Sequence, residues 1–292
     1  MGLKRTPCDR SWAYTQEEVA SFMNTPNVDD QIGIDFAYRI PKEKVLALLP
    51  PHLEYFDNIA VGYLRQLRAA EFASPYNELC IAVLAKYGDA VGPYAVTLML
   101  HGPGAECGQI CGAELAPIPK KLADDIVIDR FGDKVSAHVV RHGERIFEIG
   151  IDLSQPYNDE QMGNGLLGDG SNVGKTVEGM QMYHRHALYQ TEDGRTEADH
   201  VQFCGMTVST KTSQFEKGRI TKLEFRSTPD DPYEEITAES LIGADWAITE
   251  KCIMQSGTVL GDLDPKETLP YLLACFYDSA LFGKNTVRLQ FR

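Results

Sequence analysis

The first half of the chain carries a succession of short apolar runs, several with alternating hydrophobic and polar positions. Most are rich in β-branched and aromatic residues and are bounded by glycine or proline, a pattern that predicts β-strands. Similar runs resume in the second half, beyond a polar stretch. The predicted strands are Ile32–Arg39, Ile59–Arg68, Tyr76–Lys86, Val91–His101, Asp125–Arg130, Lys134–Arg141, Arg145–Asp152, Met180–Tyr189, His200–Thr212 and Arg219–Ser227. Two further apolar segments, 238–247 and 253–260, fit either a strand or a helix.

Helical patterns are fewer. Pro41 precedes a predicted helix at Lys42–Leu49, because proline suits the first position of a helix, and Gly104–Glu114 and Pro265–Leu281 are predicted to be helical as well. Strands and helices do not alternate regularly, which argues against a doubly wound parallel sheet. We therefore predict an α+β fold, mainly antiparallel β, in which a curled sheet forms a β-cone or barrel with a few peripheral helices.

A polar, glycine-rich stretch at residues 154–178 interrupts the strands and shows little hydrophobic periodicity. Irregular stretches of this length inside a compact domain are often functional or mobile. Within it, Gly168–Thr176 approaches the phosphate-loop pattern, which requires a glycine five positions before Gly174. Asp169 occupies that position, and its carboxylate would repel phosphate. We therefore expect a lid-like loop here rather than a nucleotide site.

The 292 residues carry a formal net charge of −14. Such acidity argues against a nucleic-acid partner, because phosphates require a basic surface, and against an anionic membrane surface. The cysteines number seven, an odd count, and include no C-x-x-C pair, so we expect reduced thiols in the cytoplasm. We find neither a signal peptide nor an apolar run long enough to span a membrane. A small molecule is the expected partner.

Two adjacent lysines, Lys120 and Lys121, follow the stiff apolar segment Ala116-Pro-Ile-Pro119. Neighbouring lysines are most often a solvated surface pair. Here the prolines hold the backbone in a defined conformation, and apolar neighbours and a second ammonium group both favour the neutral amine. A neutral amine is what attack on a carbonyl requires. We therefore predict that Lys120 is a nucleophile that forms Schiff bases.

The residues around this lysine pair resemble a family signature. Gly112-Ala-Glu-Leu-Ala-Pro-Ile-Pro-Lys-Lys-Leu-Ala123 is similar to the signature of the acetoacetate decarboxylase family, which contains Gly-Arg-Glu and then Pro-Lys-Lys-Leu. Weaker similarities follow the family order at Leu49–Glu54, Pro75–Glu78 and Gly218–Phe225, the last running into Asp230–Pro232. The resemblance implies an acetoacetate decarboxylase-like domain at residues 31–262, an N-terminal arm at 1–30 and a C-terminal helical extension at 263–292.

The resemblance also implies residue roles. Lys120 would be the Schiff-base lysine, Lys121 the neighbour that perturbs it, and Glu78 an active-site carboxylate. Glu114 would be the glutamate of the signature, although it fits a structural partner of Lys121 equally well. The family fold is an antiparallel β-cone around a hydrophobic cavity, and it oligomerises, so we expect a homo-oligomer.

Three departures from the family pattern concern the expected pocket. Ala113 stands where the signature usually has arginine. Gln31 is placed where the decarboxylases carry an active-site arginine, and Tyr63 where they carry a second glutamate. We expect Gln31 and Tyr63 to line the substrate pocket together with Tyr76. The lysine chemistry survives these changes, whereas the substrate and the fate of the Schiff base can differ.

The function predicted first is decarboxylation of a β-keto acid, such as acetoacetate, through an iminium on Lys120. One alternative is a Schiff-base aldolase-dehydratase or hydratase that acts on pyruvate-like oxo acids and aldehydes. A second, from another class, is a non-catalytic protein that binds a small molecule in the family cavity. No metal or other cofactor is expected, because His184 and His186 have no third ligand at a recognisable spacing.

Overall fold

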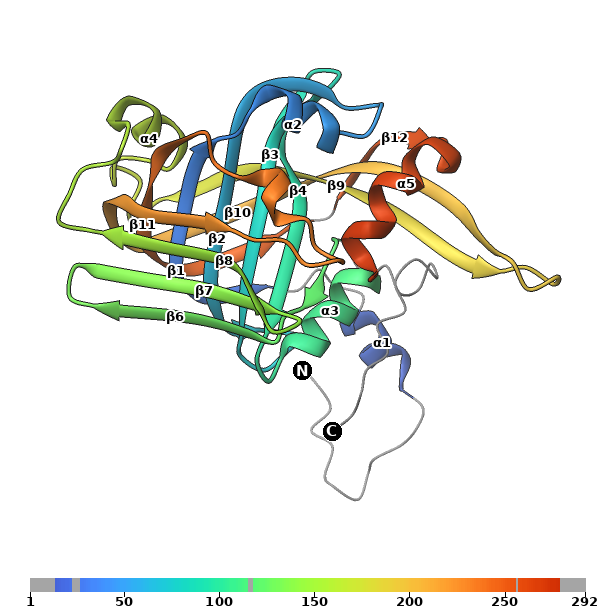
Figure 1. The fold of residues 1–292 in the computed structure, drawn as a ribbon. Helices are drawn as coiled ribbons and strands as arrows, with labels where there is room; N and C mark the ends of the chain where they lie inside the picture. The colour runs from blue at the N-terminus through green and yellow to red at the C-terminus, as the bar shows by residue number, and fades with distance from the viewer. Residues whose placement is uncertain (1–13, 23–26, 115–117, 256, 279–292) are drawn as a thin grey trace, which may run out of the picture.

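The computed structural model describes residues 14–22, 27–114, 118–255 and 257–278. Its main feature is a 12-stranded, mostly antiparallel sheet (Figure 1). The strands are β1 (Val28–Arg39), β2 (Glu54–Ala70), β3 (Tyr76–Tyr87), β4 (Ala90–His101), β5 (Lys121–Leu122), β6 (Asp125–Phe131), β7 (Lys134–Arg141), β8 (Glu144–Asp152), β9 (Thr176–Gln190), β10 (Thr196–Phe225), β11 (Ser240–Met254) and β12 (Thr258–Leu263). The helices are α1 (Gln16–Phe22), α2 (Lys42–Leu48), α3 (Ala105–Glu114), α4 (Glu160–Leu166), the 3-10 helix η2 (Tyr233–Ile236) and α5 (Pro265–Phe276).

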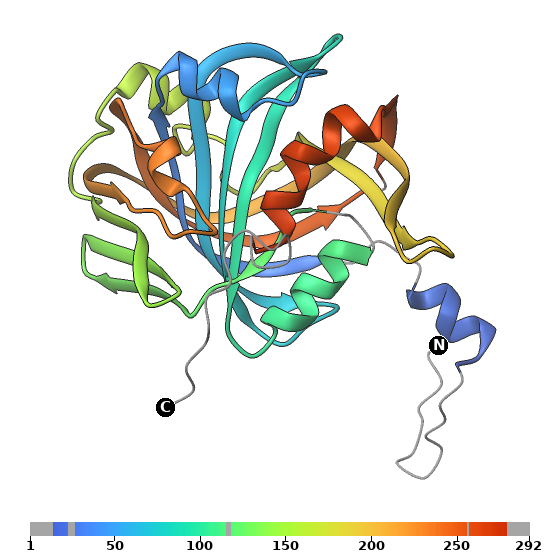
Figure 2. The same cartoon turned by 45° about the vertical axis from the view of Figure 1, so that its right-hand side comes forward.

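Part of the sheet closes on itself as a ring. The strand order is β11-β1-β2-β3-β4-β9-β10, and β10 also pairs with β11, which completes the circle. The last residues of β10 leave the ring and pair with β8. Strands β8, β7 and β6 form a smaller layer that lies across one side of the ring (Figures 1 and 2).

The main core lies between the ring and the smaller layer. It includes Ile34, Phe36, Leu64, Leu79 and Ile81 from the ring and Ile126, Val139, Phe147 and Ile149 from the layer. Successive side chains of a strand point to opposite faces of the sheet, so the alternate residues of the same ring strands face the other side. There they form a second cluster with Leu67, Tyr76, Cys80, Leu100 and Ile118. Glu78 shares this second face.

The predicted fold class is confirmed, because a curled, mainly antiparallel sheet carries a few helices. The helices expected at 42–49 and 104–114 correspond to α2 and α3. The helix expected at Pro265–Leu281 is α5, which ends at Phe276, and residues 279–281 lie outside the described part. Asp264 caps α5 by accepting a hydrogen bond from the Lys266 backbone N–H at 2.8 Å. No described helix combines the length and apolarity needed to cross a bilayer.

The prediction of an irregular stretch at 154–178 was wrong for α4. A cap and packing on the ring hold this short helix, because Met162 and Leu166, four residues apart, pack against the buried cluster of Ala37, Ile59 and Ile242. Asp159 accepts a hydrogen bond from the Met162 backbone N–H at 3.1 Å. The ring of Tyr157 packs against Gly163, where a Cβ atom would lie 2.4 Å from Tyr157 Cδ2. The two strands expected at 200–212 and 219–227 belong to one long strand, β10.

Candidate active site

Lys120 lies immediately before β5, which pairs with β4 in parallel and so fixes the backbone of the lysine segment against the ring. Its Nζ atom lies 2.9 Å from Glu78 Oε2, and the two side chains are only 10% and 4% exposed. Helix α3 covers the lysine from one side. Gln109 Nε2 donates a hydrogen bond to the Lys120 carbonyl at 3.1 Å, and a Cβ atom on Gly112 would lie 2.7 Å from Lys120 Cδ. The amine is therefore held away from bulk water.

Glu78 joins the lysine to Tyr63. The Tyr63 hydroxyl donates a short hydrogen bond of 2.5 Å to Glu78 Oε1, while Glu78 Oε2 faces Lys120. The register of β2 and β3 explains the contact, because Tyr63 lies opposite Cys80 and diagonally across from Glu78 on the same face. Burial and the negative charge of Glu78 raise the pKa of Tyr63 well above its ordinary value. Tyr63 is thus a neutral donor next to a carboxylate.

Tyr76 and Cys80 flank Glu78 along β3. Tyr76 is buried, and its hydroxyl has no hydrogen-bond partner among the described residues. Burial and the nearby Glu78 raise the pKa of both the Tyr76 phenol and the Cys80 thiol. Both groups therefore stay neutral on either side of Glu78.

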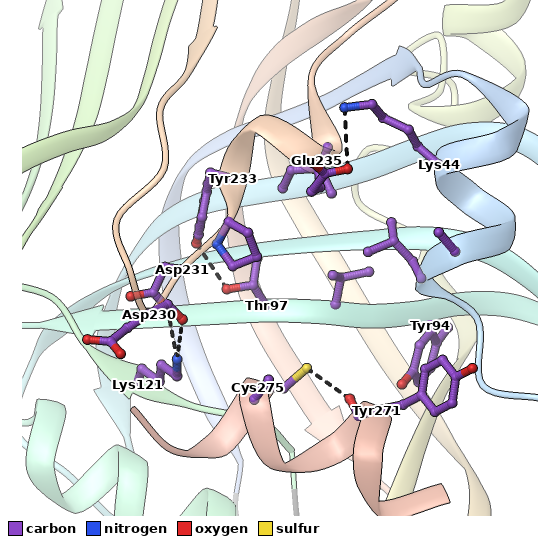
Figure 3. A pocket seen from close by; sticks show the side chains of 16 residues that line it. Lys44, Tyr94, Thr97, Lys121, Asp230, Asp231, Tyr233, Glu235, Tyr271 and Cys275 are labelled. Atoms are coloured by element: carbon purple, nitrogen blue, oxygen red, sulfur yellow. Dashed lines mark hydrogen bonds and ion pairs between the residues drawn. The ribbon is translucent and has the colours of Figure 1, made fainter. Parts of the chain in front are cut away.

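Lys121 is held by a different set of carboxylates. Its Nζ atom lies 2.9 Å from Asp231 Oδ1 and 3.5 Å from Asp278 Oδ1. Arg141 pairs with the same two aspartates, so the group is a buried ion network. Lys121 and Asp231 lie at one end of a pocket of about 260 Å³ between the ring and α5 (Figure 3). The ammonium groups of Lys120 and Lys121 therefore have separate partners.

Gln31 bonds with Arg65, and Glu114 carries no described side chain. Gln31 Nε2 donates to the Val28 carbonyl at 2.7 Å, and Gln31 Oε1 accepts from Arg65 at 2.9 Å. Glu114 ends α3, and its side chain lies outside the described residues. The structure thus brings Lys120, Glu78 and Tyr63 together in one chain of contacts, with Tyr76 on the same face and Gln31 on β1.

Sequence reasoning did not identify Arg65 and its two carboxylate neighbours. Arg65 Nε donates to Asp35 Oδ1 at 2.9 Å, and a second nitrogen pairs with Oδ2 of the same aspartate. Asp245 lies opposite Asp35 on β11 and is 1% exposed. Neither of its carboxyl oxygens has a hydrogen-bond partner in the described chain. Burial first, and then the charge of Asp35, raise the pKa of Asp245 well above its usual range. A carboxylate inside each of two apolar strand runs was the available signal.

A cavity of about 470 Å³ adjoins this cluster on the same face of the ring. Its polar lining includes Tyr63, Arg65, Asp35, Glu178, Gln181 and Thr210, and its apolar walls include Val61, Leu84, Leu166, Met180 and Val208. Leu166 and Leu167 come from α4 and the residue after it, so the segment expected to be lid-like forms one wall. Tyr63 connects the cavity to Glu78 and, through Glu78, to Lys120.

His184 and His186 have different surroundings. His184 Nε2 lies 2.9 Å from Nε2 of His52, while the His186 ring packs against Phe276 with centroids 4.9 Å apart. Burial lowers the pKa of His184 to about 3 and that of His52 to about 4. Both rings are therefore neutral near pH 7, and one donates a hydrogen bond to the other.

One group of described side chains has the spacing of metal ligands. The ligand atoms of His142, Asp230 and Asp278 lie within 4.8 Å of one another. His142 Nε2 is 3.0 Å from Asp230 Oδ2, and Asp278 already pairs with Arg141 and Lys121. These ion pairs suit a charge network, and the group lies apart from Lys120.

Comparison with known proteins gives the following similarities. The profile of the family "Acetoacetate decarboxylase (ADC)" matches residues 12–263. The "CLA biosynthesis isomerase" of Lactiplantibacillus plantarum is 32% identical over 277 residues, which cover 94% of this chain and 96% of that protein.

Solved structures share the fold. An acetoacetate decarboxylase-like enzyme from Sphingomonas wittichii RW1 superposes with a TM-score of 0.65 at 17% identity, covering 82% of this chain and 94% of that one. The enduracididine biosynthesis enzyme MppR complexed with pyruvate gives a TM-score of 0.58 at 13% identity, covering 89% and 96%. At these identities the structural matches establish the shared fold alone.

Proposed function

Because the chain belongs to the acetoacetate decarboxylase family, we propose that it is an enzyme in which Lys120 forms a Schiff base with a ketone. The observation that carries the proposal is the contact between a sheltered amine and a buried carboxylate, Lys120 Nζ to Glu78 Oε2 at 2.9 Å. An amine in such surroundings is a nucleophile once it has given up its proton, and Glu78 is placed to accept that proton.

The first steps need only groups that are present in the chain. The Lys120 ammonium passes a proton to Glu78, and the free amine adds to the substrate carbonyl. Glu78 then returns the proton to the carbinolamine oxygen, which leaves as water and produces the iminium. The Tyr63 hydroxyl, bonded to the other carboxyl oxygen, keeps Glu78 in place during both transfers.

For the later steps we favour isomerisation of an unsaturated ketone. A relative that is 32% identical over nearly the whole chain is named an isomerase. An iminium acidifies the C–H bond beside it, and loss of that proton to Glu78 gives a dienamine. Reprotonation two carbons further along moves the double bond into conjugation, and water then releases the ketone and the free lysine. Atoms balance without an oxidant or a cofactor.

Decarboxylation is the second candidate, and the match to the acetoacetate decarboxylase profile favours it. The same iminium would accept the electron pair of the departing carboxylate. The charges around the amine favour it less. A β-keto acid would place its carboxylate close to Glu78, whereas the ammonium group of the adjacent Lys121 is held by Asp231 and Asp278. The condensation with an aldehyde that the sequence leaves open starts from the same enamine.

Borohydride trapping tests the Schiff base directly. We expect a ketone and borohydride to add one reduced adduct, located on Lys120 by peptide mass analysis. Lys120→Ala should abolish the adduct, whereas the control Lys86→Ala, at an exposed ion pair, should retain it. If no oxo compound of any class forms an adduct, the chain is a binding protein. NMR of the product distinguishes a moved double bond from a condensed product, and CO₂ release identifies decarboxylation.

A further inference from the structure

Arg65 lies at the junction of two adjoining cavities. The cavity of about 470 Å³ beside Tyr63 is here called the apolar compartment. A second cavity of about 220 Å³, the polar compartment, is lined by Arg65, Asp169, Lys175, Thr210, Thr212 and Thr249 among others. Asp35, Arg65 and Thr210 line both. The Arg65 guanidinium therefore forms part of the wall of both compartments.

The guanidinium is fixed in place with part of its donor edge unused. Asp35 accepts two of its hydrogen bonds, and Gln31 accepts a third. A guanidinium has five N–H groups, so two remain beyond these bonds within the described residues. The side chain is 16% exposed. A planar fork that is already oriented binds a carboxylate with little further loss of freedom.

We propose that Arg65 binds a carboxylate of the substrate where the two compartments meet. This rests on the proposed function, because it takes the ketone to react at Lys120. Arg65 on β2 lies opposite Glu78 on β3, but its guanidinium turns away from Glu78 toward Asp35 on β1. One to two strand spacings, about 5–10 Å, therefore separate the guanidinium from the carboxylate that holds the reacting amine. The substrate class that fits is an oxo acid whose carboxylate is several carbon atoms from its ketone.

The local charges permit an anion at this position. Asp35 is paired with Arg65 itself. Two other carboxylates line the compartments: Asp169, whose pKa is lowered by hydrogen bonds from the Ser171 side chain and from its backbone N–H at 2.9 Å, and Glu178, which accepts a hydrogen bond from the Ser209 hydroxyl at 3.1 Å. Lys175 adds a second cation to the polar compartment. Asp245 would repel an anion if it were ionised, but burial and the charge of Asp35 raise its pKa and keep it neutral. Arg65 thus places a cation beside Gln31, which stands where the decarboxylases carry an active-site arginine.

The test is adduct formation by oxo acids and their methyl esters. A series of saturated oxo acids with increasing separation between ketone and carboxylate is trapped on Lys120 with borohydride, and the half-saturating concentration is measured for each acid and ester. For the best acid, we expect the wild-type protein to need about tenfold less acid than ester, because a charged hydrogen bond is lost on esterification. Arg65→Gln should abolish this preference and leave the ester unchanged.

Two further variants keep the test decisive. Arg68→Gln, on the same strand but at an exposed pair with Asp30, should retain the preference for the acid. If Arg65→Gln fails to fold, the double variant Asp35→Asn with Arg65→Gln removes the pair without leaving a buried charge. The proposal is overturned if acid and ester are trapped equally by the wild type, or if loss of Arg65 weakens both to the same extent. Absence of any adduct would instead refute the Schiff base itself.

Discussion

Glu78 is the residue on which the proposed chemistry depends, because one carboxyl oxygen faces the amine and the other faces a phenol. Lys120 and Tyr63 have no direct contact that would replace it. A carboxylate in this position both holds the ammonium group and accepts its proton. An amide of the same shape retains hydrogen-bonding capacity but loses the second role.

The substitution Glu78→Gln separates these two roles. We expect the rate of borohydride trapping on Lys120 to fall by about a hundredfold or more, the usual effect of removing a general base, while circular dichroism shows an intact fold. Glu148→Gln, at a surface ion pair on β8, is the control and should trap at the normal rate. An unchanged rate in Glu78→Gln would mean that Glu78 only holds the lysine in position.

Helix α3 constrains the Lys120 side chain because the helix packs close to it. Gly112 leaves room for the Lys120 side chain, since a Cβ atom there would come within 2.7 Å of Cδ and 3.0 Å of Cε. Alanine is also the better helix former, by about 1 kcal/mol. The close contact therefore predicts slower trapping by Gly112→Ala, whereas the higher helix propensity of alanine predicts no loss of stability.

We expect Gly112→Ala to trap ketones more slowly, because the methyl group displaces the end of the lysine, with a melting temperature no lower than that of the wild type. The matched control is Gly165→Ala in α4, where an added Cβ would meet no atom within 4 Å. That variant should gain stability and trap normally. Equal trapping by both variants would show that α3 does not constrain the lysine.

The sequence predicts individual elements well because strand alternation and helix signals are local. It predicts the site less completely, since each contact depends on register between segments far apart. Arg65 meets Asp35 because β1 and β2 pair with one particular offset, and a shift of one residue would turn the side chain to the other face. Lys121 illustrates the same limit. Its adjacency to Lys120 suggested mutual influence, whereas Asp231 and Asp278 hold its ammonium group.

Across the whole molecule, buried groups with shifted pKa values govern how stability changes with pH: Asp245 on the alkaline side, and His184 with its partner His52 on the acidic side. Asp245 has a raised pKa in the folded chain, so folding favours its protonated form. Its unfavourable contribution to the free energy of folding is absent below the pKa of an aspartate in the unfolded chain, near 4, and grows as the pH rises from there. Burial lowers the pKa of His184 to about 3, so folding favours its neutral form, and stability falls as the pH drops below about 6.5.

Asp245→Asn tests the alkaline side of this dependence. The amide carries no charge at any of these pH values, so the variant should gain stability over the wild type as the pH rises from 4 to 8. In a chain of this size, a gain of about 1 kcal/mol corresponds to a melting temperature roughly 2–4 °C higher. The measurement is thermal unfolding across that pH range. A variant less stable than the wild type at pH 8 would mean that Asp245 is ionised and well compensated.

His184→Gln tests the acidic side. Between pH 7 and 4.5 the wild-type ring should cost the fold about 2.5 kcal/mol, because the unfolded chain binds a proton that the buried ring does not. The variant loses the ring contacts with His52 and Phe203, so it should be less stable than the wild type at pH 7, and this difference should shrink on acidification. His138→Gln on β7 is the control and should follow the wild-type curve. Asp245 lowers stability as the pH rises and His184 lowers it as the pH falls, so stability should be greatest between about pH 4 and 6.5. Parallel acid curves for His184→Gln and the wild type would show that another group controls stability at low pH.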